Sequence, residues 1–337
     1  MKKLLFYLIC VSLLSSCGKN EKQTLLSPMI IGNVDDSKLV INDSFPIGDV
    51  RRYGVYPNTT IAGSYLKTIL EFSSGGSELY FPEGYYPINL NLVGLSNISI
   101  YFDHAILGGG LSIIDKANES SSRIAIKGNL KVLDKIFIRN SNNIYFQNVT
   151  VASDTVKNLY KNKNRGVSIY SGARYLKFEK LLIQDTGGDS LKFYTHIAAA
   201  LQVHGWNNNP EYISIDELEI ENAGRTALYL TGNNHLLKKV TIRNFGLGSP
   251  KNMFGLEDSN PGDETEFSGA WINKCNNCVI DSLSIKNSMH KGDYSIHFGI
   301  GQYSKPSFIN NVQFLEHAIK MPLKDDPLTN ILVKKVY

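Results

Sequence analysis

The chain has 337 residues, of which 42% are hydrophobic and 20% are charged, and its formal net charge at pH 7 is +4. A net charge so close to zero excludes the strongly basic surface typical of proteins that bind nucleic acid. The length and the apolar content suffice for a large buried core, which a repetitive architecture can build as a single domain.

Residues 1–16 predict a targeting signal that is not part of the fold. Lys2 and Lys3 precede the apolar residues 4–14, a stretch far shorter than the roughly 20 residues that span a membrane as a helix. The stretch runs into Leu14-Ser15-Ser16-Cys17, which resembles the lipobox of bacterial lipoproteins. An ordinary secretory signal is the alternative interpretation.

The lipobox resemblance implies where the mature protein lies. Cleavage would leave Cys17 as the lipidated N-terminus, and the lipid would hold the protein to a membrane of the bacterial cell envelope, with the outer membrane as the expected site. Residues 17–45 have no clear periodicity and are expected to be a polar tether. Residues 46–337 are expected to form the folded domain.

Two short motifs open the folded domain. Residues 48–55 are Gly-Asp-Val-Arg-Arg-Tyr-Gly-Val, and residues 78–86 are Glu-Leu-Tyr-Phe-Pro-Glu-Gly-Tyr-Tyr. In this order they resemble the opening of the pectate-lyase-like superfamily, where an Asp-Val-x-x-Tyr-Gly-Ala run leads into a helix and then into a strand similar to the second motif. Residues 65–70 can supply that helix. The family's usual Asp-Gly-x-x-Asp-Asp-Thr segment is absent, and Pro57-Asn58-Thr59-Thr60 stands in its place.

The resemblance implies a fold rather than one activity. The expected structure is an all-β, single-stranded right-handed parallel β-helix with a short N-terminal capping helix. The superfamily contains polysaccharide lyases, polygalacturonase-like hydrolases, epimerases and phage tailspikes, so the reaction has to be argued from the site.

A repeated apolar pattern independently predicts the same fold. In its clearest copy, Ile213, Ile215, Leu218 and Ile220 form two alternating pairs separated by two residues. Alternation at period two predicts strands, and the gap predicts a corner between them. Asparagines recur beside the corners, where they tolerate left-handed backbone. The second apolar position recurs at intervals of about 22 to 43 residues, the range of repeat proteins: Phe146, Phe178, Ile215, Leu237, Ile280, Ile309 and Val333.

Cys275 and Cys278 form a Cys-x-x-Cys motif, which in isolation fits redox chemistry or half of a metal site. In the repeat, however, Cys278 aligns with the apolar Ile213. We therefore predict an inward structural cysteine, with a disulfide to Cys275 as a further option in an exported chain. No second pair of ligands supports zinc.

A further strand is expected in each coil, and its alternation predicts an outward column. In Leu228-Tyr229-Leu230 the flanking residues would point inward and the central residue outward. The other expected strands are Val167-Ser168-Ile169, Leu191-Lys192-Phe193, Ala270-Trp271-Ile272 and Ile296-His297-Phe298. Stacking then places Ser168, Lys192, Tyr229, Trp271 and His297 side by side, about 4.8 Å apart. The alternative is that these side chains merely cover the sheet.

Polar residues at the same edge predict a carbohydrate site. Aromatic faces suit sugar rings, and arginines suit carboxylates. Long insertions at residues 195–209 and 246–268 are expected to form its walls. The predicted substrate-binding residues are Arg165, Ser168, Trp271, His290 and Asp293, and the predicted ligand is a polysaccharide or oligosaccharide.

Hydrolysis is one candidate reaction. An inverting hydrolase needs two carboxylates beside the scissile bond, and polygalacturonase-like hydrolases place theirs in Asn-Thr-Asp-Gly, Gly-Asp-Asp-Cys and Gly-His-Gly motifs on successive coils. The corresponding segments here are Asn164-Arg165-Gly166, Gly187-Gly188-Asp189-Ser190 and Gly224-Arg225-Thr226. Only Asp189 retains a carboxylate of that set, unless acids of the long insertions substitute.

β-Elimination from a uronic acid fits the residues better. A positive group or Ca²⁺ neutralises the carboxylate, a base removes the adjacent proton, and an acid protonates the leaving oxygen. Lys192 is the expected base, and Tyr229 or His297 the expected acid. The full predicted catalytic set is Asp189, Lys192, Arg225, Tyr229 and His297. The sequence assigns no metal site, and a non-catalytic glycan-binding surface lipoprotein is the alternative of a different class.

Overall fold

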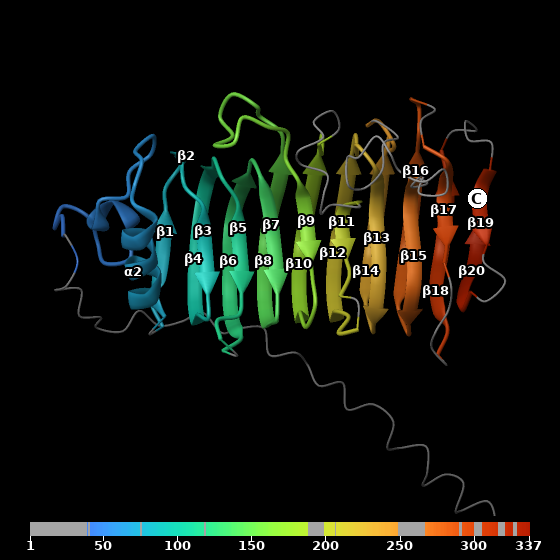
Figure 1. Ribbon diagram of the computed structural model, residues 1–337, viewed down its shortest axis with the longest axis horizontal. Coiled ribbons are helices and arrows are strands. Elements are labelled where there is room, and N and C mark those ends of the chain that lie inside the picture. The colour runs from blue at the N-terminus through green and yellow to red at the C-terminus, as the bar shows by residue number, and fades with distance from the viewer. Residues whose placement is uncertain are drawn as a thin grey trace, which may run out of the picture.

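The protein is a parallel β-helix in which strands stack coil upon coil along one long axis (Figure 1). Every pairing between the described strands is parallel, as in the stacking of β12 on β10 and of β13 on β11. The all-β solenoid predicted from the repeat is therefore confirmed. The computed structural model describes residues 39, 41–74, 76–117, 119–187, 199–205, 207–248, 267–289, 292–299, 305–315, 321–325 and 329–337.

The coils contribute strands to two stacks. The first stack contains the longer, bent strands β4 (Ser96–Leu107), β6 (Ser121–Val132), β8 (Ser141–Ala152), β10 (Arg174–Gln184), β12 (Glu211–Glu221), β14 (Leu236–Arg243), β16 (Val279–Lys286), β18 (Ser307–Phe314) and β20 (Ile331–Val336). The second stack contains β3 (Leu90–Val93), β5 (Leu111–Ile114), β7 (Lys135–Arg139), β9 (Gly166–Ile169), β11 (Ala199–Val203), β13 (Thr226–Asn233), β15 (Ser268–Asn276), β17 (Tyr294–Phe298) and β19 (Met321–Asp325).

The apolar positions of the repeat stack in register inside the solenoid. Phe146 pairs with Phe178, and Phe178 pairs with Ile215. The Phe146 and Phe178 rings lie parallel, with centroids 4.4 Å apart and planes 3° apart. The row continues through Leu237, Ile280, Ile309 and Val333, as predicted. Each such side chain withdrawn from water contributes about 1.5–3 kcal/mol to folding.

Several asparagines at the corners between strands adopt a left-handed backbone conformation. Asn143, Asn234 and Asn277 have φ angles of 56°, 57° and 57°, values that asparagine tolerates better than most residues. The side chains also bond between coils, since Asn277 Nδ2 donates to Asn234 Oδ1 at 2.8 Å. The recurrent asparagines thus mark where the chain turns.

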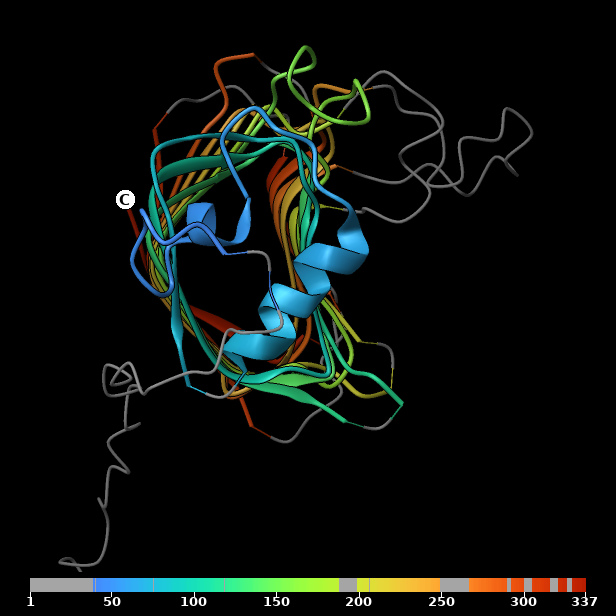
Figure 2. The same cartoon turned by 90° about the vertical axis from the view of Figure 1, so that its left-hand side faces the viewer.

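The N-terminal end of the core is covered by helix α2 (Gly63–Ser73), which lies across the open end of the solenoid (Figure 2). Leu66, Ile69 and Leu70 are its buried apolar residues. The short helix η1 (Val50–Tyr53) precedes α2 in the chain. The strands β1 (Glu78–Phe81) and β2 (Gly84–Tyr86) follow it and pair with the two halves of β4. The capping helix and the strand of the second motif are both present.

The two cysteines of the Cys-x-x-Cys motif are buried, and both thiols are free. The inward position of Cys278 is as predicted, but the disulfide to Cys275 is not formed. In the coil below Cys278 the same inward row holds His235, whose Nδ1 accepts from the Ile213 N–H at 3.2 Å and whose Nε2 lies 2.9 Å from the Thr231 carbonyl oxygen. The interior thus accommodates this imidazole by bonding both of its nitrogens to the backbone.

The predicted signal peptide and Cys17 lie outside the described residues, as does the tether up to residue 38. In the part of the chain that the structure describes, no helix has both the length and the apolar character needed to cross a membrane. Lipid anchoring therefore stays a prediction.

Candidate functional site

The outward-pointing side chains of the second stack form a row, which we call the outward column. Its register joins Ser168, Gln202, Tyr229, Trp271 and His297 on five successive strands. The flanking residues of each strand are buried in the core. Between them, Ser168, Gln202 and Tyr229 are also largely covered, at 7–9% exposure, whereas Trp271 and His297 are partly exposed. Four steps of about 4.8 Å make the column about 19 Å long, which is enough for several sugar rings.

The strand that carries Gln202 corrects the sequence alignment. The rung between β9 and β13 is β11 (Ala199–Val203), so Gln202 stands where Lys192 was expected. Before this rung, the Gly187 N–H donates to the Asn164 carbonyl at 2.8 Å. The triplets around Lys192 and Gln202 have the same apolar alternation, so the local pattern does not distinguish them. Asp189, Lys192 and His290 lie outside the described residues.

The aromatic members of the outward column pack against one another. The Tyr229 and Trp271 ring centroids are 4.7 Å apart, and Trp271 stacks on His297 at 5.0 Å with planes 1° apart. Tyr229 is only 8% exposed although it points outward. The Trp271 Nε1 is shielded from solvent and has no hydrogen-bond partner among the described residues. A shielded donor of this kind costs about 1–3 kcal/mol unless something accepts from it.

His204 joins the column from the turn after β11. Its ring centroid lies 5.5 Å from that of Tyr229 and 5.8 Å from that of Tyr170. Burial and the nearby charge of Lys274 lower the pKa of His204, while burial raises the pKa of Tyr229. At neutral pH a neutral imidazole therefore lies beside a protonated phenol. From the sequence, His204 belongs only to the insertion of residues 195–209. No local pattern indicates that this part of the insertion lies beside the outward column.

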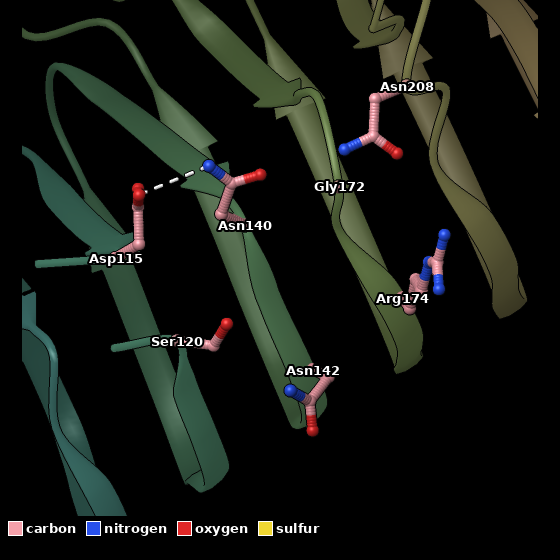
Figure 3. A pocket seen from close by; sticks show the side chains of 7 residues that line it. All are labelled: Asp115, Ser120, Asn140, Asn142, Gly172, Arg174 and Asn208. Carbon is pink, nitrogen blue, oxygen red and sulfur yellow. Dashed lines mark hydrogen bonds between the residues drawn. The ribbon is translucent and has the colours of Figure 1, made fainter. Parts of the chain in front are cut away.

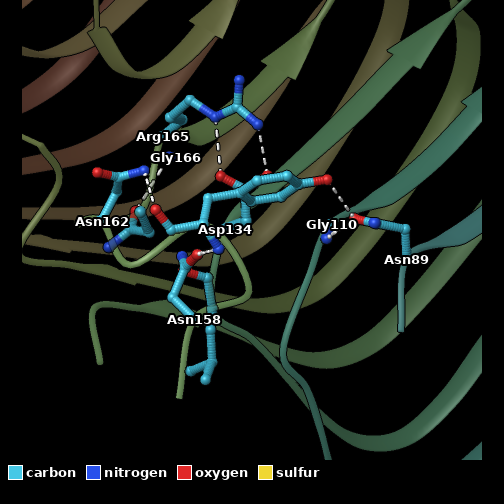
Figure 4. Close-up of polar contacts among 10 residues, drawn as sticks. Asn89, Gly110, Asp134, Asn158, Asn162, Arg165 and Gly166 are labelled. Carbon is cyan, nitrogen blue, oxygen red and sulfur yellow. Dashed lines mark hydrogen bonds and ion pairs between the residues drawn. The ribbon is translucent and has the colours of Figure 1, made fainter. Parts of the chain in front are cut away.

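Arg165 is engaged differently from the prediction. Its Nε and Nη2 donate to the two carboxylate oxygens of Asp134 at 2.8 and 2.5 Å (Figure 4). Asp134 is 2% exposed, so the pair anchors Arg165 and leaves only part of its guanidinium for a ligand. Burial and the charge of Arg165 lower the pKa of the neighbouring Lys135, whose ammonium lies 5.5 Å from the centre of the Phe137 ring.

The loop before Arg165 is fastened to the coils beneath it (Figure 4). Asn158 Nδ2 donates to the Leu133 carbonyl at 2.5 Å, and the Tyr160 hydroxyl donates to Asn89 Oδ1 at 3.2 Å. The Arg165 guanidinium lies over the Tyr160 ring, 5.8 Å from its centroid. The hydrogen bonds hold the loop as a fixed wall at the N-terminal end of the outward column.

Arg225 and Asp293 both lie beside Phe267, immediately before β15. The Arg225 side chain is buried, with its guanidinium carbon 5.9 Å from the Phe267 ring centroid. The exposed Asp293 accepts from the Phe267 N–H at 2.6 Å. The structure thus gathers two predicted site residues around Phe267, at one end of the strands that carry Tyr229 and Trp271.

Calcium has no evident site in the described residues. Ca²⁺ takes several oxygen ligands, and within the described ranges no group of three or more histidine, cysteine, aspartate or glutamate side chains could hold a metal ion.

In comparisons with protein-family models, with curated proteins and with solved structures, nothing matched this chain. The parallel β-helix is therefore shown by the structure of this chain itself. Its function has to be inferred from the residues of the outward column.

Proposed function

We propose that the protein is a carbohydrate-active enzyme of the pectate-lyase-like superfamily that cleaves an acidic polysaccharide by β-elimination along the outward column. The observation that carries the proposal is the packing of a neutral His204 against a protonated Tyr229, in line with Trp271 and His297. The base and the acid of an elimination must be present together in these two protonation states.

In the proposed reaction His204 removes the proton from C5 of a uronic acid residue. The electrons form the C4–C5 double bond, the bond from C4 to the leaving oxygen breaks, and the Tyr229 hydroxyl protonates that oxygen. Exchange with solvent then returns the proton from His204 and restores Tyr229. The faces of Trp271 and His297 are packed against each other, so their outward edges would contact neighbouring sugar rings.

The acidic substrate class is supported by the positive charge at one end of the outward column. Lys135 and Arg165 face a single buried carboxylate, Asp134, so the cluster carries net positive charge. Burial, together with repulsion from Arg165, lowers the pKa of Lys135, and a carboxylate beside its ammonium would offset both effects. A uronate group supplies such a carboxylate, whereas a neutral sugar does not.

The test uses polygalacturonate, alginate and chondroitin sulfate as probes. We expect ultraviolet absorbance from the unsaturated product with at least one polymer, and its loss in Tyr229→Phe. The control Tyr101→Phe alters an exposed tyrosine of an N-terminal coil and should leave the rate unchanged. New reducing ends without absorbance would indicate a hydrolase, and saturable binding without product would indicate a glycan-binding protein; both outcomes contradict the lyase.

We also propose, from the sequence, that Cys17 anchors the protein by lipid to the bacterial cell envelope. The lipobox-like Leu14-Ser15-Ser16-Cys17 supports this location. Metabolic labelling with a radioactive fatty acid should mark the wild-type protein, whereas Cys17→Ala should remain unlabelled. Equal labelling of both would contradict the anchor.

A further inference from the structure

A second concave site lies outside the outward column, in the turns that follow the second stack. It is a pocket of about 420 Å³ between the turns after β5, β7, β9 and β11 and the starts of β8 and β10 (Figure 3). Its lining is polar and includes Asp115, Asn140, Asn142, Gly172, Arg174 and Asn208.

Gly172 lets two amide groups converge at this pocket. Its φ is 71°, and a Cβ there would lie 2.2 Å from Asn140 Oδ1 and 2.9 Å from Asn208 Nδ2. No side chain could occupy position 172 without displacing both amides. The two asparagines therefore approach each other over a backbone that only glycine can supply.

The hydrogen-bonding capacity of the pocket is only partly used. Asp115 accepts from Arg139 Nη2 at 3.0 Å and from Asn140 Nδ2 at 3.2 Å. The side-chain amide of Asn208 makes no hydrogen bond with any described residue, and Arg174 reaches Glu211 only at 3.5 Å. An amide and a guanidinium thus retain donors at the pocket. The charges nearby cancel, because Asp115 pairs with Arg139 and Arg174 with Glu211.

Two exposed tyrosines lie at corners adjoining the pocket in the chain, although neither is among its lining residues. Tyr175 follows Arg174 in the chain, and its ring stacks on Tyr212 with centroids 4.7 Å apart and planes 7° apart. The two residues remain 41% and 39% exposed. Because Tyr212 covers one face of Tyr175, the other face is turned toward the preceding coil, which carries the small Asn143 at that register and Asn142 in the pocket lining.

The backbone of the tyrosines is unfavourable for an aromatic residue. Tyr175 and Tyr212 both have φ of 55°, and the equivalent corners of other coils carry Arg123 and four asparagines, namely Asn97, Asn143, Asn234 and Asn277. Asparagine tolerates such a conformation and tyrosine does not. Strained residues of this kind concentrate at functional sites, so stability alone does not explain an exposed aromatic pair at two successive corners.

We propose that the turn pocket and the Tyr175–Tyr212 pair form a carbohydrate-binding site, separate from the outward column, for a neutral oligosaccharide. The tyrosine face takes the apolar face of a sugar ring, and Asn208 and Arg174 donate to its hydroxyl groups. A neutral sugar fits because the charges at the pocket are already paired. Such a site would hold a polymer beside the solenoid independently of cleavage at the column.

The experiment compares wild type with the double variant Tyr175→Asn and Tyr212→Asn in affinity gels containing glucan, mannan, xylan or galactan. Asparagine already occupies the equivalent corners, so the double variant should fold with an equal or higher unfolding temperature. We expect wild type to be retarded by at least one neutral polymer, and the double variant and Asn208→Ala to bind at least about tenfold more weakly. The control Tyr101→Asn should bind as wild type does.

Four results would overturn the proposal. The first two are that no neutral polymer retards the wild type, and that the double variant binds as strongly as the wild type. The third is that only uronic acid polymers retard the protein. The fourth is that Trp271→Ala loses the same binding, which would place the ligand on the outward column. A change of oligomeric state in the double variant, measured by sedimentation velocity without any change in glycan binding, would identify a contact between copies instead. The lyase assay is independent, because the tyrosine variants should retain uronate cleavage if that activity exists.

Discussion

The outward faces of the two stacks differ in how their polar groups are satisfied. On the first stack, Asp216 pairs with Lys177 on one side and with Lys238 on the other. On the second stack, the outward column presents Tyr229 and Trp271, packed ring to ring. Both faces stand on the same continuous core, so the core does not account for the difference.

The pairing of charges on the first stack makes that face self-sufficient. Burial acts to raise the pKa of Asp216, but the hydrogen bonds from Lys177 and Lys238 outweigh it and the pKa is lowered. On the second stack, by contrast, burial raises the pKa of Tyr229, and Trp271 Nε1 is shielded from solvent with no hydrogen-bond partner in the described part of the chain. A face that satisfies its own charges stabilises the solenoid, whereas a face with unmatched donors is suited to a ligand.

The largest effect is expected at His204. His204→Gln removes the proposed base and should lower the rate of uronate cleavage by about 10²–10⁴-fold. Because the pKa of His204 is lowered, the wild-type rate should fall only below the ordinary histidine value of about 6.5, where the imidazole becomes protonated. His104→Gln, at an exposed histidine, is the matched control. A variant that keeps the wild-type pH profile would show that His204 is not the base.

Trp271→Ala should weaken substrate binding by about tenfold, since an aromatic contact contributes about 0.5–1.5 kcal/mol. Isothermal titration with a polymer that the enzyme cleaves measures the change, and circular dichroism checks that the fold persists. An unchanged affinity would mean that the aromatic side chains of the outward column only cover the sheet, and the contrast between the two faces would lose its functional meaning.

Asp216→Asn tests the face of charge pairs. With the carboxylate 33% exposed, we expect a loss of about 1 kcal/mol in the free energy of unfolding at neutral pH. Folding lowers the pKa of Asp216. The carboxylate therefore adds to the free energy of unfolding at pH values above its ordinary pKa of about 3.9, and this stabilisation is lost as the pH falls through the lowered pKa. Urea titrations of both proteins should therefore converge at acid pH. A difference that persists there would have another origin.

Lys239→Gln should have the smallest effect. Lys239 is 62% exposed and pairs with Glu217 at 2.8 Å, so its loss should change stability by less than about 0.5 kcal/mol. High salt should remove even this difference, because exposed pairs are screened. A larger loss in thermal unfolding would show that the charges of the first stack act as a cooperative network.

The sequence predicted the interior more completely than the site. The row from Phe146 to Val333 was placed coil by coil, because inward positions must be apolar on every coil and the pattern is visible locally. The local pattern does not reveal the repeat before Phe146, although Ile100 and Ile126 continue the same row in the structure. Their copies are interrupted by bulges in β4 and β6, which shift the spacing between the two halves of the pattern.

Taken alone, the sequence determined the solenoid, its capping helix, its inward rows and four members of the outward column, because alternation at period two fixes the side of a strand on which each residue lies. Only the tertiary structure decided that Gln202 completes the column, since two equivalent triplets competed for one rung. Only the structure also joined Arg165 to Asp134, which are 31 residues apart, and brought His204 against Tyr229. Contacts between coils depend on the lengths of the intervening loops, which the local pattern does not encode.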